Sequence, residues 1–171
     1  VNTFSTLAVG RARYGLMLRE DGFVMDDGTT TRFAEDRYFV TTTTANAAKI
    51  MQHIDFARQA LWPELDVQAV SVTEQWAQYA VAGPKSRALL QKLLPEIDLS
   101  NDAFPFMAAR EFKWRGVPAR LFRISFSGEL AYEIAAPAPY GDALTRALME
   151  AGAEFGVTPY GTEALGVLRI E

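Results

Sequence analysis

The apolar positions of the chain follow two spacings, alternate residues in short runs and every third or fourth residue in longer runs. The first spacing is typical of strands with one buried face, and the second is typical of amphipathic helices. Turn signals between neighbouring short runs predict antiparallel hairpins. The pattern predicts strands over residues 13–19, 23–25, 37–42, 67–72, 75–82, 109–114, 117–124 and 131–135. It predicts helices over residues 44–61 and 85–94, a third after Tyr140 that ends near Gly152 or Gly156, and a fourth from about Thr162.

These elements predict an α+β fold, with antiparallel strands in hairpins and interspersed helices. Neither G-x-G-x-x-G nor G-x-x-x-x-G-K-S/T occurs, so no dinucleotide or P-loop phosphate site is expected. A chain of 171 residues with 49% hydrophobic residues predicts a single domain over residues 1–171 with a sizeable core. It begins with Val and closes on the amphipathic run GTEALGVLRIE without a stop signal, so we expect a piece truncated at both ends.

Composition removes several classes of function. Seventeen Lys and Arg stand against 21 Asp and Glu, and the basic residues are scattered, which argues against nucleic-acid binding. The chain has no Cys, so disulfides and thiolate metal sites are excluded, and we expect a cytoplasmic location. No secretory signal or membrane-spanning run is recognised. The single histidine, His53, lies in an expected helix, so no metal site and no Ser-His-Asp triad is predicted.

The stretch from Arg120 to Pro137 contains the first candidate residue, Glu133, on the expected strand that follows a Ser-Gly turn. A carboxylate between Tyr132 and Ile134 reaches solvent only where its face of the sheet is open or lines a cavity. Glu133 is therefore a candidate binding residue, and it is alternatively a solvent-facing residue or the partner of an arginine. Glu129, at the turn, is expected to be an ordinary loop acid.

Two adjacent acids, Asp26 and Asp27, form the second candidate. Asp27 followed by Gly28 matches a two-residue hairpin turn, in which both acids would be turn residues. On an extended backbone, however, Asp27 and Thr29 would point to the same face, because side chains repeat every two residues. The sequence leaves both interpretations open.

Five segments, in this order and at these spacings, resemble the aminomethyltransferase (glycine-cleavage T-protein) family. They are YGLMLREDGFVMDDGT, VAGPKSRALL, FPFM, SFSGELAYEI and GTEALGVLRIE. Within that family the runs VNTFSTLAVGRARYGLML, DDGTTTRFAED, TTTTANA and VTEQWAQ are similar to the C-terminal region of the alpha subunits of heterotetrameric bacterial sarcosine oxidases. The resemblance covers nearly the whole chain.

The resemblance implies a T-protein-like, tetrahydrofolate-binding fold. It also implies a parent complex that oxidises sarcosine to glycine and peroxide and passes the one-carbon unit to tetrahydrofolate. FAD, FMN and NAD would then belong to other parts of that complex and not to this fragment, and the partners would be folate and the other subunits, with no nucleic acid or membrane. Two alternatives stay open: a glycine-cleavage aminomethyltransferase that uses a lipoyl carrier protein, and a non-catalytic folate-binding module.

Residue by residue, Glu133 matches the family acid that holds the pterin ring, where a carboxylate can accept hydrogen bonds from N3-H and the 2-amino group together. Asp27 matches the family aspartate near N5 and N10, where it would position or deprotonate the attacking nitrogen. A slip of one residue would give that role to Asp26. Thr29 is expected as a companion of Asp27 on the same face.

Four further residues match family positions around the ligand. Tyr14 and Phe126 match aromatic residues that stack on or wall the pterin, although many relatives have Tyr at the position of Phe126 and Thr at that of Ser127. Arg123 and Arg169 match basic positions that could meet a glutamate-tail carboxylate, and each is alternatively a structural salt-bridge partner.

Overall fold

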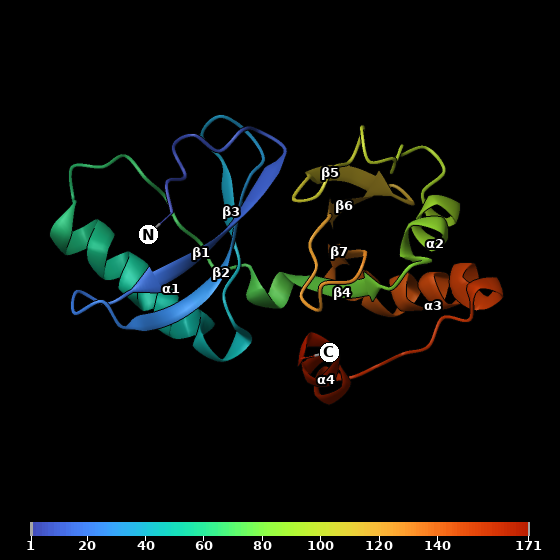
Figure 1. The fold of residues 1–171 in the computed structure, drawn as a ribbon. Helices are drawn as coiled ribbons and strands as arrows, with labels where there is room; N and C mark the ends of the chain where they lie inside the picture. Colours follow the sequence, from blue (N-terminus) through green and yellow to red (C-terminus); the bar gives the residue numbers. More distant parts are fainter. Residues whose placement is uncertain (1, 171) are drawn as a thin grey trace. The chain divides into compact units, whose positions relative to one another are not determined.

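The computed structural model describes residues 2–170 and consists of two compact units, Val1–Glu74 and Gln75–Glu171 (Figure 1). Each unit has its own sheet and its own helices. The prediction of one domain over residues 1–171 stays a prediction. Among residues 2–170, no helix combines the length and the apolar character needed to cross a bilayer.

The first unit contains β1 (Arg11–Leu18), β2 (Val24–Arg32), β3 (Tyr38–Val40), η1 (Thr44–Asn46), α1 (Ala47–Phe56) and η2 (Ala57–Leu61). The strands form an antiparallel sheet in the order β1-β2-β3. The hairpin between β1 and β2 turns at Gly22, whose φ of 85° favours glycine. The predicted helix over residues 44–61 is a 3₁₀ turn, an α-helix and a closing π-helical turn.

Of the two interpretations of Asp27-Gly28, the hairpin turn is wrong, because β2 runs straight through both residues. Gly28 is needed for space and not for a turn conformation. A Cβ atom built on it would lie 1.9 Å from the carbonyl oxygen of Thr41, which passes directly over the strand. A side chain on Gly28 would therefore push the chain that follows β3 away from β2.

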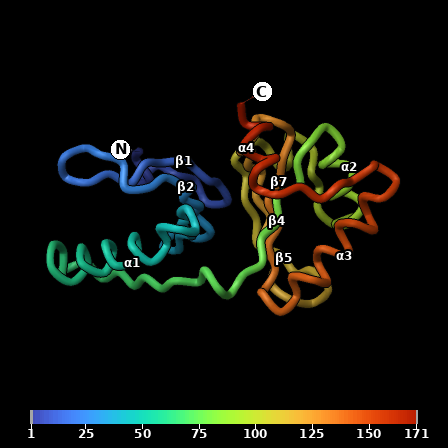
Figure 2. Tube along the Cα trace, turned by 90° about the horizontal axis from the view of Figure 1, so that it is seen from below, coloured from blue at the N-terminus to red at the C-terminus, as the bar shows by residue number. Residues whose placement is uncertain are grey.

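The second unit contains β4 (Trp76–Ala82), α2 (Ser86–Leu93), β5 (Ala109–Trp114), β6 (Val117–Phe122), β7 (Ala131–Pro137), η4 (Ala138–Tyr140), α3 (Gly141–Gly152), η5 (Ala153–Phe155) and α4 (Thr162–Ile170). Its antiparallel sheet has the strand order β4-β7-β6-β5. Helices α2 and α3 lie side by side against one face of this sheet (Figure 2). The core between that face and the two helices includes Leu90, Leu121, Tyr132, Ile134 and Leu144, all fully buried.

The predicted hairpin across Arg115-Gly116 is present as β5 and β6. Both turn residues have positive φ, 50° and 86°, which is the conformation that a tight two-residue hairpin turn requires. The predicted hairpin of residues 67–72 with residues 75–82 is wrong. Residues 67–72 form no strand, and β4 pairs with β7 instead. Strand β4 pairs with β7, far away in the sequence, because β7 is buried in the core. The segment 67–72 is not, and its Val70 is 76% exposed.

Candidate acidic sites on the two sheets

Glu133 lies on β7, in the interior of the second sheet, with Ala80 of β4 and Phe122 of β6 as its Cα partners. Because side chains alternate along a strand, Tyr132 and Ile134 point into the core under α2 and α3. Glu133 points to the opposite face and is half-buried. The predicted position of this acid on a strand between two apolar residues is therefore the one observed.

Gln78 of β4 holds the Glu133 carboxylate. Its Nε2 donates a hydrogen bond of 2.5 Å to Oε2 of Glu133. Gln78 is the Cα partner of Ala135, so it is the diagonal cross-strand neighbour of Glu133. Burial raises the pKa of Glu133, and the hydrogen bond from Gln78 offsets part of that rise. The other oxygen, Oε1, accepts no hydrogen bond from the described part of the chain.

An arginine and an indole lie further along the same face. Arg120 of β6 and Trp76 of β4 flank β7, where their Cα partners are Ala135 and Pro137. The guanidinium carbon of Arg120 lies 3.9 Å from the ring centroid of Trp76, a close cation–π contact. Its Nε lies 3.4 Å from Oε1 of Glu111. This face of the sheet thus presents an acid held by an amide and a cation stacked on an aromatic ring.

The second group of candidates lies on the first sheet. The Cα pairs Tyr14–Thr29 and Leu16–Asp27 place Tyr14, Asp27 and Thr29 on one face of the β1–β2 ladder. The Tyr14 hydroxyl donates a hydrogen bond of 2.7 Å to Oδ2 of Asp27. The hydroxyl of Thr29 lies 3.0 Å from that of Thr41. The extended alternative for Asp27 and Thr29 is the one observed.

Asp26 points to the other face of β2 and is only 4% exposed. Its carboxylate accepts two hydrogen bonds of 2.9 Å from Thr43, one from the backbone N–H and one from the hydroxyl. Burial would raise the pKa of Asp26, but the hydrogen bonds from Thr43, Asp27 and Asn46 together lower it below its ordinary value. Asp26 therefore anchors the chain that enters the first helix.

The remaining candidates lie in the second unit. Nη1 of Arg123 donates a hydrogen bond of 2.8 Å to the carbonyl oxygen of Phe104, so its guanidinium already supports a loop. Phe126 is 54% exposed, and the guanidinium carbon of Arg169 lies 4.8 Å from its ring centroid. Arg169 and Phe126 therefore form a surface cation–π pair. Among residues 2–170, no three His, Asp or Glu side chains gather as a metal site.

Sequence reasoning missed Gln78, Arg120 and Trp76 as neighbours of Glu133. Gln78 is 55 residues away from Glu133 in the sequence, so no local spacing relates them. The signal would have been the pairing of β4 with β7, which places Gln78 on the face of Glu133.

The two antiparallel sheets and their helices make this an α+β protein, and comparison with family models identifies its family. The GCVT N-terminal domain matches residues 1–171. The chain belongs to that family, and the predicted family and fold class are both confirmed.

Relatives of two kinds are similar to this chain. The sarcosine oxidase subunit alpha of Rhizobium meliloti (strain 1021) is 60% identical over 99% of the chain and 17% of its own length. The protein of the same name from Corynebacterium sp. (strain P-1) is 51% identical over 99% of the chain and 18% of its own length. The aminomethyltransferase of Thermus thermophilus is 37% identical over 99% of the chain and 46% of its own length. The chain thus spans less than half of each of these relatives.

A solved structure shows the same fold. It is the glycine cleavage system aminomethyltransferase T from Bartonella henselae, with a TM-score of 0.78 and 24% identity. The match covers 96% of this chain and 41% of that one.

Proposed function

We propose that this chain is the tetrahydrofolate-binding part of a sarcosine oxidase alpha subunit. The parent complex would demethylate sarcosine oxidatively to glycine and peroxide, and it would pass the one-carbon unit to tetrahydrofolate to give 5,10-methylenetetrahydrofolate. The observation that carries the proposal is Glu133, a half-buried acid with one oxygen held by Gln78. Membership of the GCVT family and 60% identity to a sarcosine oxidase subunit alpha support it.

The chemistry of Glu133 suits a pterin. A neutral pterin presents N3-H and the 2-amino group side by side, and a carboxylate can accept both hydrogen bonds. Gln78 limits the rotation of the carboxylate, so the entropy lost on binding is smaller than for a free side chain. The raised pKa of Glu133 would fall when two donors bind it, because hydrogen bonds to the charged form stabilise that form.

The second acid of the proposal is Asp27. Its hydrogen bond from Tyr14 fixes the carboxylate on the exposed face of β2, whereas Asp26 is turned inward onto Thr43. In the proposal, Asp27 faces the reactive N5 and N10 nitrogens and positions or deprotonates the nitrogen that attacks the one-carbon unit. Tyr14 and Thr29 accompany it on the same face.

The exposed residues Phe126 and Arg169 have supporting roles in the proposal. Phe126 walls the pterin, and Arg169 binds the carboxylates of the glutamate tail. Arg123 is the weaker candidate for that tail because its guanidinium is engaged with the Phe104 carbonyl. FAD, FMN and NAD belong to other parts of the cytoplasmic complex in this proposal.

Calorimetric titration of the complete polypeptide with a reduced folate tests the proposal. Replacing Glu133 by Ala removes a charge-assisted pair of hydrogen bonds, which should cost about 1.5–3 kcal/mol, or roughly a ten- to hundredfold rise in Kd. Glu129→Ala, at the exposed turn before β7, is the matched control and should bind like the wild type. Equal affinity of wild type and Glu133→Ala would remove Glu133 from the site.

The reaction itself separates this function from its alternatives. Sarcosine-dependent peroxide formation by the complete complex supports the oxidase, whereas ammonia release that requires a lipoylated carrier protein would show a glycine-cleavage aminomethyltransferase. Methylenetetrahydrofolate formation no faster than the uncatalysed rate would show a module that binds folate without chemistry.

A further inference from the structure

Strand β4 is an edge strand of the second sheet. It pairs with β7 along one side, and no strand pairs with its other side within residues 2–170. The backbone N–H of Gly83 donates to the carbonyl of Leu130, which follows the same ladder towards β7. Because the direction of the N–H alternates along a strand, the amides of Gln78, Ala80 and Ala82 point to the open side.

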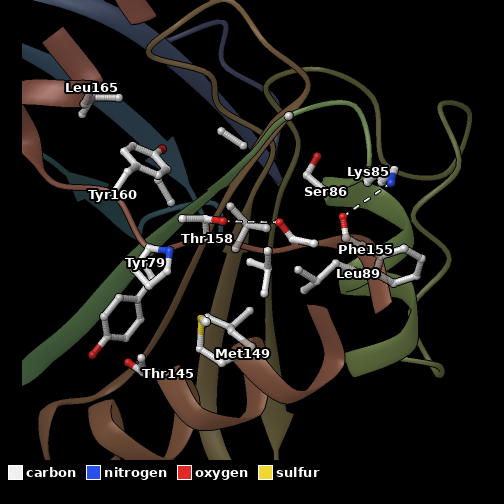
Figure 3. A pocket seen from close by; sticks show the side chains of 18 of the residues that line it. Tyr79, Lys85, Ser86, Leu89, Thr145, Met149, Phe155, Thr158, Tyr160 and Leu165 are labelled. Carbon is white, nitrogen blue, oxygen red and sulfur yellow. Dashed lines mark hydrogen bonds between the residues drawn. The ribbon is translucent and has the colours of Figure 1, made fainter. Parts of the chain in front are cut away.

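A groove of about 870 Å³ runs along this open side (Figure 3). Strand β4 contributes residues 78–82, including Tyr79, while Leu89 and Met149 come from α2 and α3. The other wall comes from the segment 155–165, of which residues 155–162 and Leu165 line the groove. This segment includes Tyr160 and forms no strand. An apolar groove beside a row of unpaired backbone groups has the two features that bind an extended segment, hydrogen bonds for the main chain and hollows for alternate side chains.

The topology also leaves a place for a strand beside β4. In the order β4, α2, β5 to β7 and α3, two strand–helix units pack their helices on the same face. A strand after α3 that pairs with β4 would complete a split βαβ arrangement. In this chain α3 is followed instead by an irregular segment and by α4.

The sarcosine oxidase alpha relatives contain additional polypeptide that would fill this place, because the chain spans only 17% and 18% of their length. A second copy of this chain fits less well. In the second copy, β4 would also lie in a groove whose other wall is the segment 155–165. The two copies of this segment would therefore keep the two β4 edges from pairing.

We propose that the open edge of β4 and the groove beside it bind an extended segment of the same longer polypeptide, from outside residues 1–171, as an added strand. The segment has apolar side chains at alternate positions, which enter the groove towards Leu89 and Met149. It hydrogen-bonds to the outward backbone groups of Gln78, Ala80 and Ala82. This inference does not depend on folate binding.

Amide hydrogen exchange, resolved to single residues by mass spectrometry, tests the proposal on the complete polypeptide and on the 171-residue chain. The amides of Gln78, Ala80 and Ala82 are expected to exchange about 100-fold more slowly in the complete polypeptide. Those of Tyr79 and Val81 bond to β7 and should be protected in both, which makes them an internal control for folding. Equal rates at the three outward amides in both proteins would overturn the proposal.

Two further measurements make the assignment specific. Ala80→Pro removes an outward donor and no bond to β7, so in the complete polypeptide it should abolish the slow exchange of Gln78 and Ala82 while Tyr79 and Val81 stay protected. Unchanged protection at Gln78 and Ala82 in this variant would contradict an added strand. Light scattering of the 171-residue chain should show a monomer, whereas a dimer with protected outward amides would assign the edge to a second copy and overturn the proposal.

Discussion

Replacing Asp26 by Asn is expected to destabilise the first unit, while the same change at Asp27 is expected to leave its stability nearly unaltered. Asp26 is 4% exposed, and its carboxylate accepts two hydrogen bonds of 2.9 Å from Thr43. A hydrogen bond to a charged acceptor contributes about 1 kcal/mol more than one to a neutral acceptor, so the loss of charge should cost about 2 kcal/mol. The Asp27 carboxylate bonds only to the exposed Tyr14 hydroxyl among the described residues, and Asp27→Asn should cost less than about 1 kcal/mol.

The pH dependence of this effect has a definite sign. The pKa of Asp26 in the folded protein lies below its ordinary value of 3.8, since the hydrogen bonds outweigh the effect of burial. The stabilisation is therefore fully present above pH 3.8 and is lost as the pH falls through the lowered pKa. The difference between wild type and Asp26→Asn should shrink correspondingly in acid.

Native-state hydrogen exchange over β2 and β3 measures the free energy of opening in the three proteins at neutral and acid pH. Titration of the complete polypeptides with a reduced folate supplies the second readout. Asp26→Asn should bind folate once folded, whereas Asp27→Asn should bind or turn over folate less well. A stable Asp26→Asn variant that loses folate, beside an Asp27→Asn variant that keeps it, would refute the assignment of the two acids.

Three other changes probe the two sheets. Glu133→Gln removes an ionisation that burial makes unfavourable. The free energy of unfolding of this variant, relative to that of the wild type, should therefore increase as the pH rises from 4.5 through the raised pKa. A difference in urea unfolding that does not change with pH would contradict this. Gln78→Leu removes the donor to Glu133 and should raise the pKa of that acid further in a carbon-13 NMR titration, and an unchanged or lower pKa would exclude the bond. Gly28→Ala should lower the free energy of unfolding in urea by about 1–3 kcal/mol, because the added Cβ would collide with the Thr41 carbonyl. The control Gly166→Ala, on the open surface of α4, should be neutral or stabilising. Equal effects of the two changes would show that Gly28 is not spatially constrained.

The elements set by local chemistry were predictable from the sequence. The hairpin across Arg115-Gly116 needs only a tight turn and two β-forming runs, and both are adjacent in the chain. The position of Glu133 on a strand between Tyr132 and Ile134 follows from the same alternation, as does the helix over residues 85–94 from its apolar spacing. The family resemblance added the roles of the candidate residues, which remain predictions.

The pairing of β4 was decided by tertiary packing. Residues 67–72 alternate like a strand next to β4 in the sequence, but β7 offers a partner whose other face is already packed against α2 and α3. Local spacing describes which face of a strand is apolar, not which other strand lies beside it. The same long-range pairing brought Gln78 to Glu133 across 55 residues.

The two adjacent acids show the same division at the level of single residues. Once β2 is known to be extended, the alternation of side chains alone makes Asp26 and Asp27 point to opposite faces. The face of β2 that becomes covered is the one over which the chain at Thr41 and Thr43 passes. Asp26 lies on this covered face, whereas Asp27 lies on the other face and accepts a hydrogen bond from Tyr14. Side-chain direction is a property of the local backbone, whereas burial is produced by segments that the sequence holds far apart.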